Sequence, residues 1–308
     1  MKQRIWFLLA LFVSLLAVAC SAQAASISLG TAGAFNTFIF NDFACSSDTE
    51  GRLAVGGNAT LSSYSVGDKL QPGQYDDILV VGGDLTYTGG RVYYGDIRVG
   101  GSANMPGYNV ADGKLVENDA NLPVDFAAEA AYLKSMSAAL AKEVGNGTVE
   151  HQGGSFQLTG DGVSGLQVFN LDGNDLLNAH TYNVTDIAPG ATVLFNVSGE
   201  TSGLTNMSLN SLTPMNDRVL FNFYEATTLE LSGIAVEGSI LAPQADVISP
   251  SGVVWGTIIA SSWDGPMQQN HVSFEGELPI PTPAPAAIVL LGGGLAGLAG
   301  VRRKFLKK

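Results

Sequence analysis

The chain has 308 residues, of which 46% are hydrophobic, 14% are charged and 38 are glycines. This length is enough for one large domain with a substantial core, and so much glycine without a collagen triplet is typical of an all-β fold with many tight turns. Of the 15 basic residues, two precede residue 26 and five follow residue 301, which leaves 8 basic against 28 acidic side chains between them. Such an acidic body disfavours nucleic acid and anionic polysaccharide as partners, because both require clustered lysine and arginine.

Residues 1–25 are predicted to be a signal peptide. Lys2 and Arg4 provide the charged start, and an apolar run follows that is short for a membrane span. The small residues that signal peptidase requires are Ala22, Ala24 and Ala25. We expect the cut after Ala24 or Ala25. A second interpretation stays open, because residues 17–20 loosely resemble a lipoprotein box in which Cys20 is lipidated.

One short phrase occurs three times between residues 51 and 105. Each copy has a few β-favouring residues, a glycine pair and a small polar residue, and the copies are Leu53–Asn58, Leu79–Asp84 and Ile97–Ser102. The recurrence predicts strands that stack on one another and share a continuous core. Because the copies are unevenly spaced, we expect an irregular right-handed β-solenoid (β-helix) rather than an array of identical repeats.

Residues 123–144 are predicted to form one long flanking α-helix. Pro123 suits the first helical position, and Gly145 is expected to end the helix. A single apolar stripe repeats every three or four residues and comprises Phe126, Ala130, Leu133, Met136, Leu140 and Val144. At about 33 Å this helix would cover about seven strand layers on one side of the solenoid.

The β pattern resumes after residue 147 and continues to residue 276. Val193–Val197 is echoed by Val219–Phe223, and Gly238–Pro243 is echoed by Gly256–Ala260. No linker separates the two halves, so residues 26–277 are predicted to be one domain interrupted by its helix. This domain contains a single cysteine, Cys45, which is expected to be a small buried residue.

Candidate metal ligands are few. Asp172, Asn174 and Asp175 form the best local group of oxygen ligands, and both a weak calcium site and an ordinary turn explain it. The three histidines, His151, His180 and His271, are far apart and lack ligand spacing. With no nucleophile elbow and no phosphate loop, neither catalytic residues nor a cofactor are predicted.

The C-terminal region differs in composition from the rest of the chain. Residues 278–285 have proline at every second position, which predicts an extended spacer. Residues 286–308 are predicted to be a short transmembrane helix with a basic tail, because an uncharged, mostly apolar run precedes Arg302, Arg303 and Lys304. The positive cluster should stay in the cytoplasm and place the body outside.

This tail resembles the PEP-CTERM sorting signal of Gram-negative bacteria. The matching pieces are Pro283, Ala284 and Pro285, then Leu290–Leu295, then Arg302, Arg303 and Lys304, with Ala284 in place of the signature glutamate. The resemblance implies that an exosortase-like membrane enzyme cuts near the prolines. It also implies a route by Sec export through an inner-membrane intermediate to the cell surface, the outer envelope or the extracellular matrix.

The body is similar to the choice-of-anchor A domain. The residues that carry the similarity are Phe35–Phe38, Glu50–Asn58, Gly238–Asp246 and Gly256–Ala260. The resemblance implies an adhesin-like module without a catalytic centre. We therefore expect a structural or adhesive protein of the envelope or biofilm matrix, with signal peptidase, an exosortase-like enzyme and an extracellular polysaccharide or surface ligand as partners.

Two other functions remain open. A secreted glycan-active β-helix enzyme would carry carboxylates scattered along a groove, which a single sequence does not reveal. A protein that binds ice or a mineral surface would need a flat face of threonines or carboxylates. We rank this second alternative lower, because no repeated Thr-x-Thr ladder is recognised in the sequence.

Overall fold

The computed structural model describes residues 29–106 and 113–279. The predicted signal peptide, the sorting motif and the C-terminal membrane segment lie outside these residues. The described part is mainly β, as expected. None of its helices combines the length and the apolar character needed to span a membrane.

The first part of the chain contains a short 3₁₀ helix, short strands and one long helix. They are η1 (Gly30–Ala34), β1 (Thr37–Ile39), β2 (Phe43–Cys45), β3 (Asp48–Thr49), β4 (Leu53–Val55), β5 (Ala59–Val66), β6 (Asp77–Val81), β7 (Leu85–Val92), β8 (Asp96–Val99), β9 (Ala103–Asn104), β10 (Leu115–Val116) and α2 (Phe126–Leu140).

The second part, after the long helix, is again made mostly of strands. Its elements are β11 (Thr148–Gln152), β12 (Ser155–Thr159), β13 (Leu166–Asp172), α3 (Gly173–Leu177), β14 (Thr181–Thr185), β15 (Thr192–Ser198), β16 (Thr201–Thr205), η2 (Thr213–Arg218), β17 (Val219–Phe223), β18 (Thr228–Ser232), β19 (Ile234–Glu237), β20 (Ser239–Ile248), β21 (Gly252–Trp255), β22 (Ile258–Asp264) and β23 (Gln268–Asn270).

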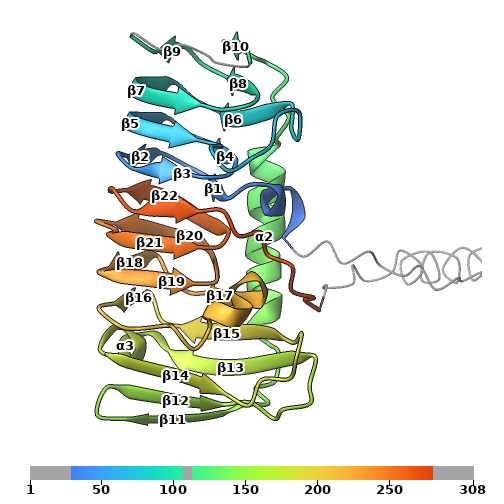
Figure 1. The fold of residues 1–308 in the computed structure, drawn as a ribbon, viewed down its shortest axis with the longest axis vertical. Coiled ribbons are helices and arrows are strands. Elements are labelled where there is room, and N and C mark those ends of the chain that lie inside the picture. The colour runs from blue at the N-terminus through green and yellow to red at the C-terminus, as the bar shows by residue number, and fades with distance from the viewer. Residues whose placement is uncertain (1–28, 107–112, 280–308) are drawn as a thin grey trace, which may run out of the picture.

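The strands stack in layers, and the chain enters the stack in the middle. From β1 the layers follow one another through β4, β6 and β8 to β10. Helix α2 then runs back alongside the stack, and the chain climbs from β13 through β15, β17 and β20 to β22. Strand β22 pairs with β1, so the blue and orange parts of Figure 1 lie directly on each other.

Three faces run along the stack. We call the ladder β13–β15–β17–β20–β22–β1–β4–β6–β8–β10 the helix face, because α2 covers part of it. The ladder β16–β18–β20–β22–β2–β5–β7–β9 is the open face. The ladder β19–β21–β23–β3–β5–β7 is the third face. Strands β11, β12 and β14 form a separate sheet at one end, in which β11 is antiparallel to β12.

The echoes in the sequence correspond to neighbouring layers. Leu53 is in register with Leu79 and Leu79 with Ile97, which confirms that the three copies of the repeated phrase stack. The later pairs stack as well, since β15 is in register with β17 over Val193–Val197 and β20 with β22 at Ala242 and Ala260.

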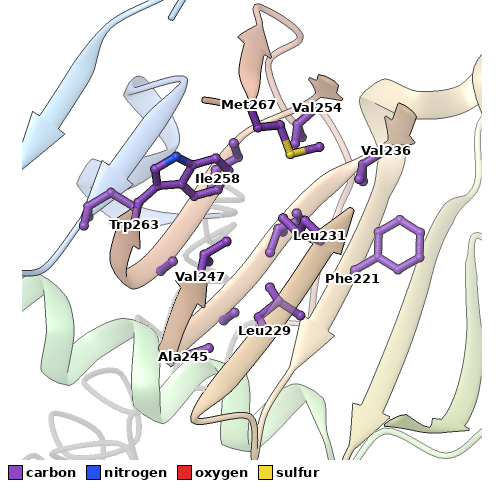
Figure 2. Packing of buried hydrophobic residues seen from close by; sticks show 14 of the residues in the cluster. Phe221, Leu229, Leu231, Val236, Ala245, Val247, Val254, Ile258, Trp263 and Met267 are labelled. Atoms are coloured by element: carbon purple, nitrogen blue, oxygen red, sulfur yellow. The ribbon is translucent and has the colours of Figure 1, made fainter. Parts of the chain in front are cut away.

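Apolar side chains from all three faces meet inside the stack and form its core. Figure 2 shows part of this core, where Leu229, Val247 and Trp263 occupy successive layers of the open face. Phe221 projects into the same core from the helix face. Cys45 is buried there as expected, and burial raises the pKa of its thiol.

The glycine pairs lie at the corner between the helix face and the open face. A Cβ on Gly82 would meet the carbonyl oxygen of Gly56, and a Cβ on Gly83 would meet Oδ1 of Asn58. The backbones of successive layers therefore approach so closely that only glycine fits, which is the physical reason for the repeated phrase.

Helix α2 is shorter than the predicted 123–144. Asp125 is its N-cap and accepts a hydrogen bond from the backbone N–H of Ala128, so Pro123 precedes the helix. The helix ends at Leu140 rather than at Gly145, and Val144 is 84% exposed and does not belong to the apolar stripe. Its 15 residues measure about 22 Å and span the layers from β4 to β15, six in all rather than seven.

Two buried asparagines attach the C-terminal end of α2 to the helix face. Asn196 donates to the carbonyl oxygen of Leu140 at 2.7 Å, and Asn222 donates to that of Ser137 at 3.0 Å. The Ser137 hydroxyl donates back to Oδ1 of Asn222 at 2.6 Å. The Ser137 carbonyl also accepts the N–H of Ala141 and the Leu140 carbonyl that of Glu143, so the asparagines add a second bond to each and hold the last turn of α2 on the helix face.

A second buried polar side chain joins an early and a late part of the described chain at the β22–β1 contact, which we call the seam. Asn36 donates to the carbonyl oxygens of Gly256 and Asn270, and its own oxygen accepts from the N–H of Gly51. Beyond β23, Phe274 and Leu278 lie in the apolar cluster between the helix face and α2. The described chain thus ends on the helix-covered side of the stack (Figure 1).

Candidate functional site

The open face carries an array of short polar side chains that no element covers in the described structure. Thr60 is in register with Thr86, and Thr86 with Asn104, so the three form one row across successive layers. Ser62 and Thr88 form a parallel row two residues further along the strands. All five side chains are exposed, because the residues between them point into the core.

A second polar row follows the corner beside the glycine pairs. Asp42 accepts a hydrogen bond from the N–H of Asn58, and Asn58 accepts one from the N–H of Asp84. Asp84 in turn accepts from the N–H and the hydroxyl of Ser102, and these two bonds lower the pKa of its carboxyl group. Each side chain therefore holds the backbone of the next layer and is itself fixed in place.

A groove of about 410 Å³ interrupts the open face where β2 pairs with β22. The small side chain of Ala44 lies between Asp264 on one side and Thr60 on the other, so the surface is lower at this layer. Asp42 and Ser262 also line it. The groove is open and offers carboxylate, hydroxyl and amide groups without a basic residue among them.

The calcium candidates lie elsewhere, at α3. Asp172 is the N-cap of this short helix, and its Oδ1 accepts the backbone N–H groups of Asn174 and Asp175 at 2.9 and 3.1 Å. Oδ2 of Asp175 lies 3.3 Å from Nδ1 of His151. The structure thus gives Asp172 a capping role and Asp175 a histidine partner.

The three histidines are not brought together. His151 stacks on Phe156 in the end sheet, and His180 lines a groove beside β14. His271 follows β23, where burial lowers the pKa of its imidazole against the opposing effect of Glu50. Within residues 29–106 and 113–279, no three His, Cys, Asp or Glu side chains are grouped closely enough to hold a metal ion.

The threonine rows are the feature that sequence reasoning missed. Thr86–Thr88 is a Thr-x-Thr segment and Thr60–Ser62 is a closely similar one. Each follows a glycine pair by three residues, so the repeat that precedes them was the signal that could have found the row. The sorting residues (Pro283, Ala284, Pro285, Arg302, Arg303 and Lys304) and the cleavage residues (Ala22, Ala24 and Ala25) lie outside the described residues.

Comparison with known proteins gives one match. Residues 28–271 match a family described as "Putative Ice-binding-like adhesive domain". No curated protein matches the chain. No solved structure matches it either.

Proposed function

The chain belongs to this ice-binding-like adhesive domain family, and from that membership we propose that it is a non-catalytic adhesive protein of the cell surface or extracellular matrix. The observation that carries the proposal is the open face, where Thr60, Thr86 and Asn104 form an uncovered row of hydroxyl and amide groups. Such a surface holds a ligand through many weak contacts and needs no enclosed pocket.

We infer further that the stack is a right-handed β-solenoid. The parallel ladders and the glycine corners support this architecture, since each layer contributes one strand to a face and turns at the next corner. A rigid rod of this kind keeps the spacing of its surface groups constant, which suits an extended ligand such as an extracellular polysaccharide.

The open face is tested by replacing one threonine in its middle. Thr86→Lys places a long charged side chain on the row, and we expect beads coated with this variant to lose most of their retention on films of extracellular polysaccharide under flow. Thr148→Lys is the matched control, because Thr148 is also exposed but lies on β11 in the end sheet. Equal retention of both variants would refute the assignment of the open face.

Export and anchoring complete the proposal. Residues 1–25 act as a Sec signal peptide, residues 26–277 form the adhesive domain of the choice-of-anchor A type, residues 278–285 are a spacer, and residues 286–308 are a PEP-CTERM-type membrane segment. An exosortase-like enzyme removes that segment. Mass spectrometry of the protein from cell fractions is expected to give a C-terminus near Pro285, whereas an intact Lys308 would contradict processing.

Binding to an ordered solid surface is a second candidate function, favoured by the paired rows of Thr60 with Thr86 and Ser62 with Thr88. Hydroxyl groups at a regular spacing suit the lattice of ice or of a mineral. Ice recrystallisation assays on the chain and on Thr86→Lys decide this point. If the wild-type chain inhibits ice recrystallisation and Thr86→Lys does not, the candidate function is supported. If ice crystals grow with the wild-type chain as they do in buffer alone, the candidate function is refuted.

A further inference from the structure

Trp255 is an exposed tryptophan on the third face, away from the open face. It lies at the end of β21, where Val254 points into the core and Trp255 points outward with 37% of its surface exposed. The only other tryptophan among the described residues is Trp263, which is 1% exposed and belongs to the core. A large aromatic ring held on a rigid strand gives binding surface at little entropic cost.

The neighbours of Trp255 across the stack are polar and hold specific hydrogen-bonding groups. Glu237 on β19 and Asn270 on β23 are its register partners, so their strands flank β21 at about 4.8 Å on either side. Asn270 is only 5% exposed, so its side chain supports the site from below the surface. Asn270 is positioned by Gln268, whose amide nitrogen donates to its Oδ1 at 2.8 Å.

Glu237 is a carboxylate without a basic partner. Its side chain is 8% exposed, and Oε2 accepts one hydrogen bond, from Asn216 at 2.9 Å. No lysine or arginine of the described structure forms a salt bridge with it, and Arg218, two residues after Asn216, pairs with Asp217. A largely buried carboxylate beside an exposed aromatic ring attracts a cation, both through its own charge and through the face of the ring.

We propose that Trp255 and Glu237 form a binding site for a glycan whose sugars carry protonated amino groups. The flat face of a pyranose ring packs on the indole, and the ammonium group binds the Glu237 carboxylate. The charge of the protein agrees with this ligand, because its body carries 28 acidic and 8 basic side chains. The choice of a glycan over a cationic peptide rests on the adhesive function proposed above.

The experiment uses the fluorescence of Trp255. The full chain contains three tryptophans, so Trp6→Phe and Trp263→Phe together leave Trp255 as the only reporter. Titration with an oligomer of β-1,4-linked glucosamine is expected to change its emission in a saturable manner. The fully N-acetylated oligomer, which has the same rings without the charge, is expected to bind at least about tenfold more weakly.

Substitutions in the same background test the assigned residues. Glu237→Gln is expected to weaken binding of the glucosamine oligomer about tenfold, while Glu150→Gln, the same change at an exposed glutamate of the end sheet, leaves it unchanged. Trp255→Ala, followed by retention on glucosamine-polymer resin, is expected to abolish binding. Circular dichroism confirms that each variant is folded.

Four outcomes would overturn the inference: no emission change at saturating oligomer, equal binding of the N-acetylated oligomer, equal effects of the two glutamate substitutions, or a response to polylysine with none to the sugar. The last would assign the site to a cationic peptide. Thr86→Lys separates this proposal from the adhesive one. If Thr86→Lys loses adhesion to the film but Trp255 still responds normally to the oligomer, the two sites are independent and both proposals are supported. If Thr86→Lys adheres fully, the proposal for the open face is contradicted and the proposal for Trp255 is unaffected.

Discussion

At the scale of single residues, the glycine pairs at the corner of the stack are the most strictly constrained positions, because the neighbouring layer leaves no room for a side chain. We predict that Gly83→Ala destabilises the protein by about 1–3 kcal/mol, because the new methyl group would meet Oδ1 of Asn58 and the backbone of Gly57. Urea unfolding measures the change. Gly165→Ala is the control, since a Cβ there meets nothing within 4 Å, and it should change stability by less than about 1 kcal/mol. Similar losses for both variants would contradict the steric explanation.

A second residue-scale prediction concerns pH. Burial lowers the pKa of His271 in the folded chain below its unfolded value, so the unfolded state binds the extra proton first. The stability that depends on neutral His271 is therefore complete above the unfolded pKa of about 6.5 and is lost as the pH falls below it. Unfolding free energies measured from pH 7.5 to pH 5 should fall less steeply for His271→Gln than for the wild-type chain. Parallel curves would contradict this prediction.

At the scale of elements, the asparagine contacts decide how α2 is held. Asn222→Ala leaves the buried Ser137 hydroxyl without its partner and the Ser137 carbonyl with one bond instead of two, and we predict a loss of about 1–3 kcal/mol. The helical signal in circular dichroism should begin to fall before the β signal on heating. Asn183→Ala removes an exposed bond to Gln157 and should cost less than about 1 kcal/mol. The prediction fails if Asn222→Ala melts like the control.

The strands of this fold could be predicted from the sequence, whereas the exact helix could not. Val193–Val197 and Val219–Phe223 have similar sequences and are in register on adjacent strands, because stacking places similar residues next to each other in successive layers. The apolar period of α2 identified the helix but not its end. The N–H of Glu143 bonds to the Leu140 carbonyl, three residues back, so the chain leaves the α-helix before it reaches Gly145. Asn196, 56 residues away in sequence, donates to the same carbonyl, and local sequence gives no sign of that contact.

The candidate site was less predictable than the strands. Thr60, Thr86 and Asn104 each follow a repeated glycine pair by three residues, so the repeat indicated their row. Nothing in the sequence indicates that β2, on the next layer, meets β22 of the second half and forms the groove. The neighbours of Trp255 illustrate the same limit, because Glu237 and Asn270 come from layers whose lengths differ.

At the scale of the whole molecule, the seam makes two distant parts of the chain one cooperative unit. Asn36→Ala removes the bonds to Gly256 and Asn270, and we predict a loss of about 2–4 kcal/mol. Hydrogen exchange should accelerate together in β1 and β22, although about 220 residues separate them. Asn41→Ala, which removes an exposed bond to Ser261 at the same junction, is the control. Faster exchange in β1 alone would show that the seam does not couple the two parts.

The position of the seam also determines how the protein withstands mechanical force. A pull on residue 279 must first extract Leu278 and Phe274 from beside α2 and then strand β23, before tension reaches β22. Strand β22 is hydrogen-bonded along both edges, to β20 and to β1, so its removal breaks two ladders at once, whereas a strand at the end of the stack would break only one. A tethered molecule under shear therefore loads its middle first, and its two ends remain folded until the centre gives way.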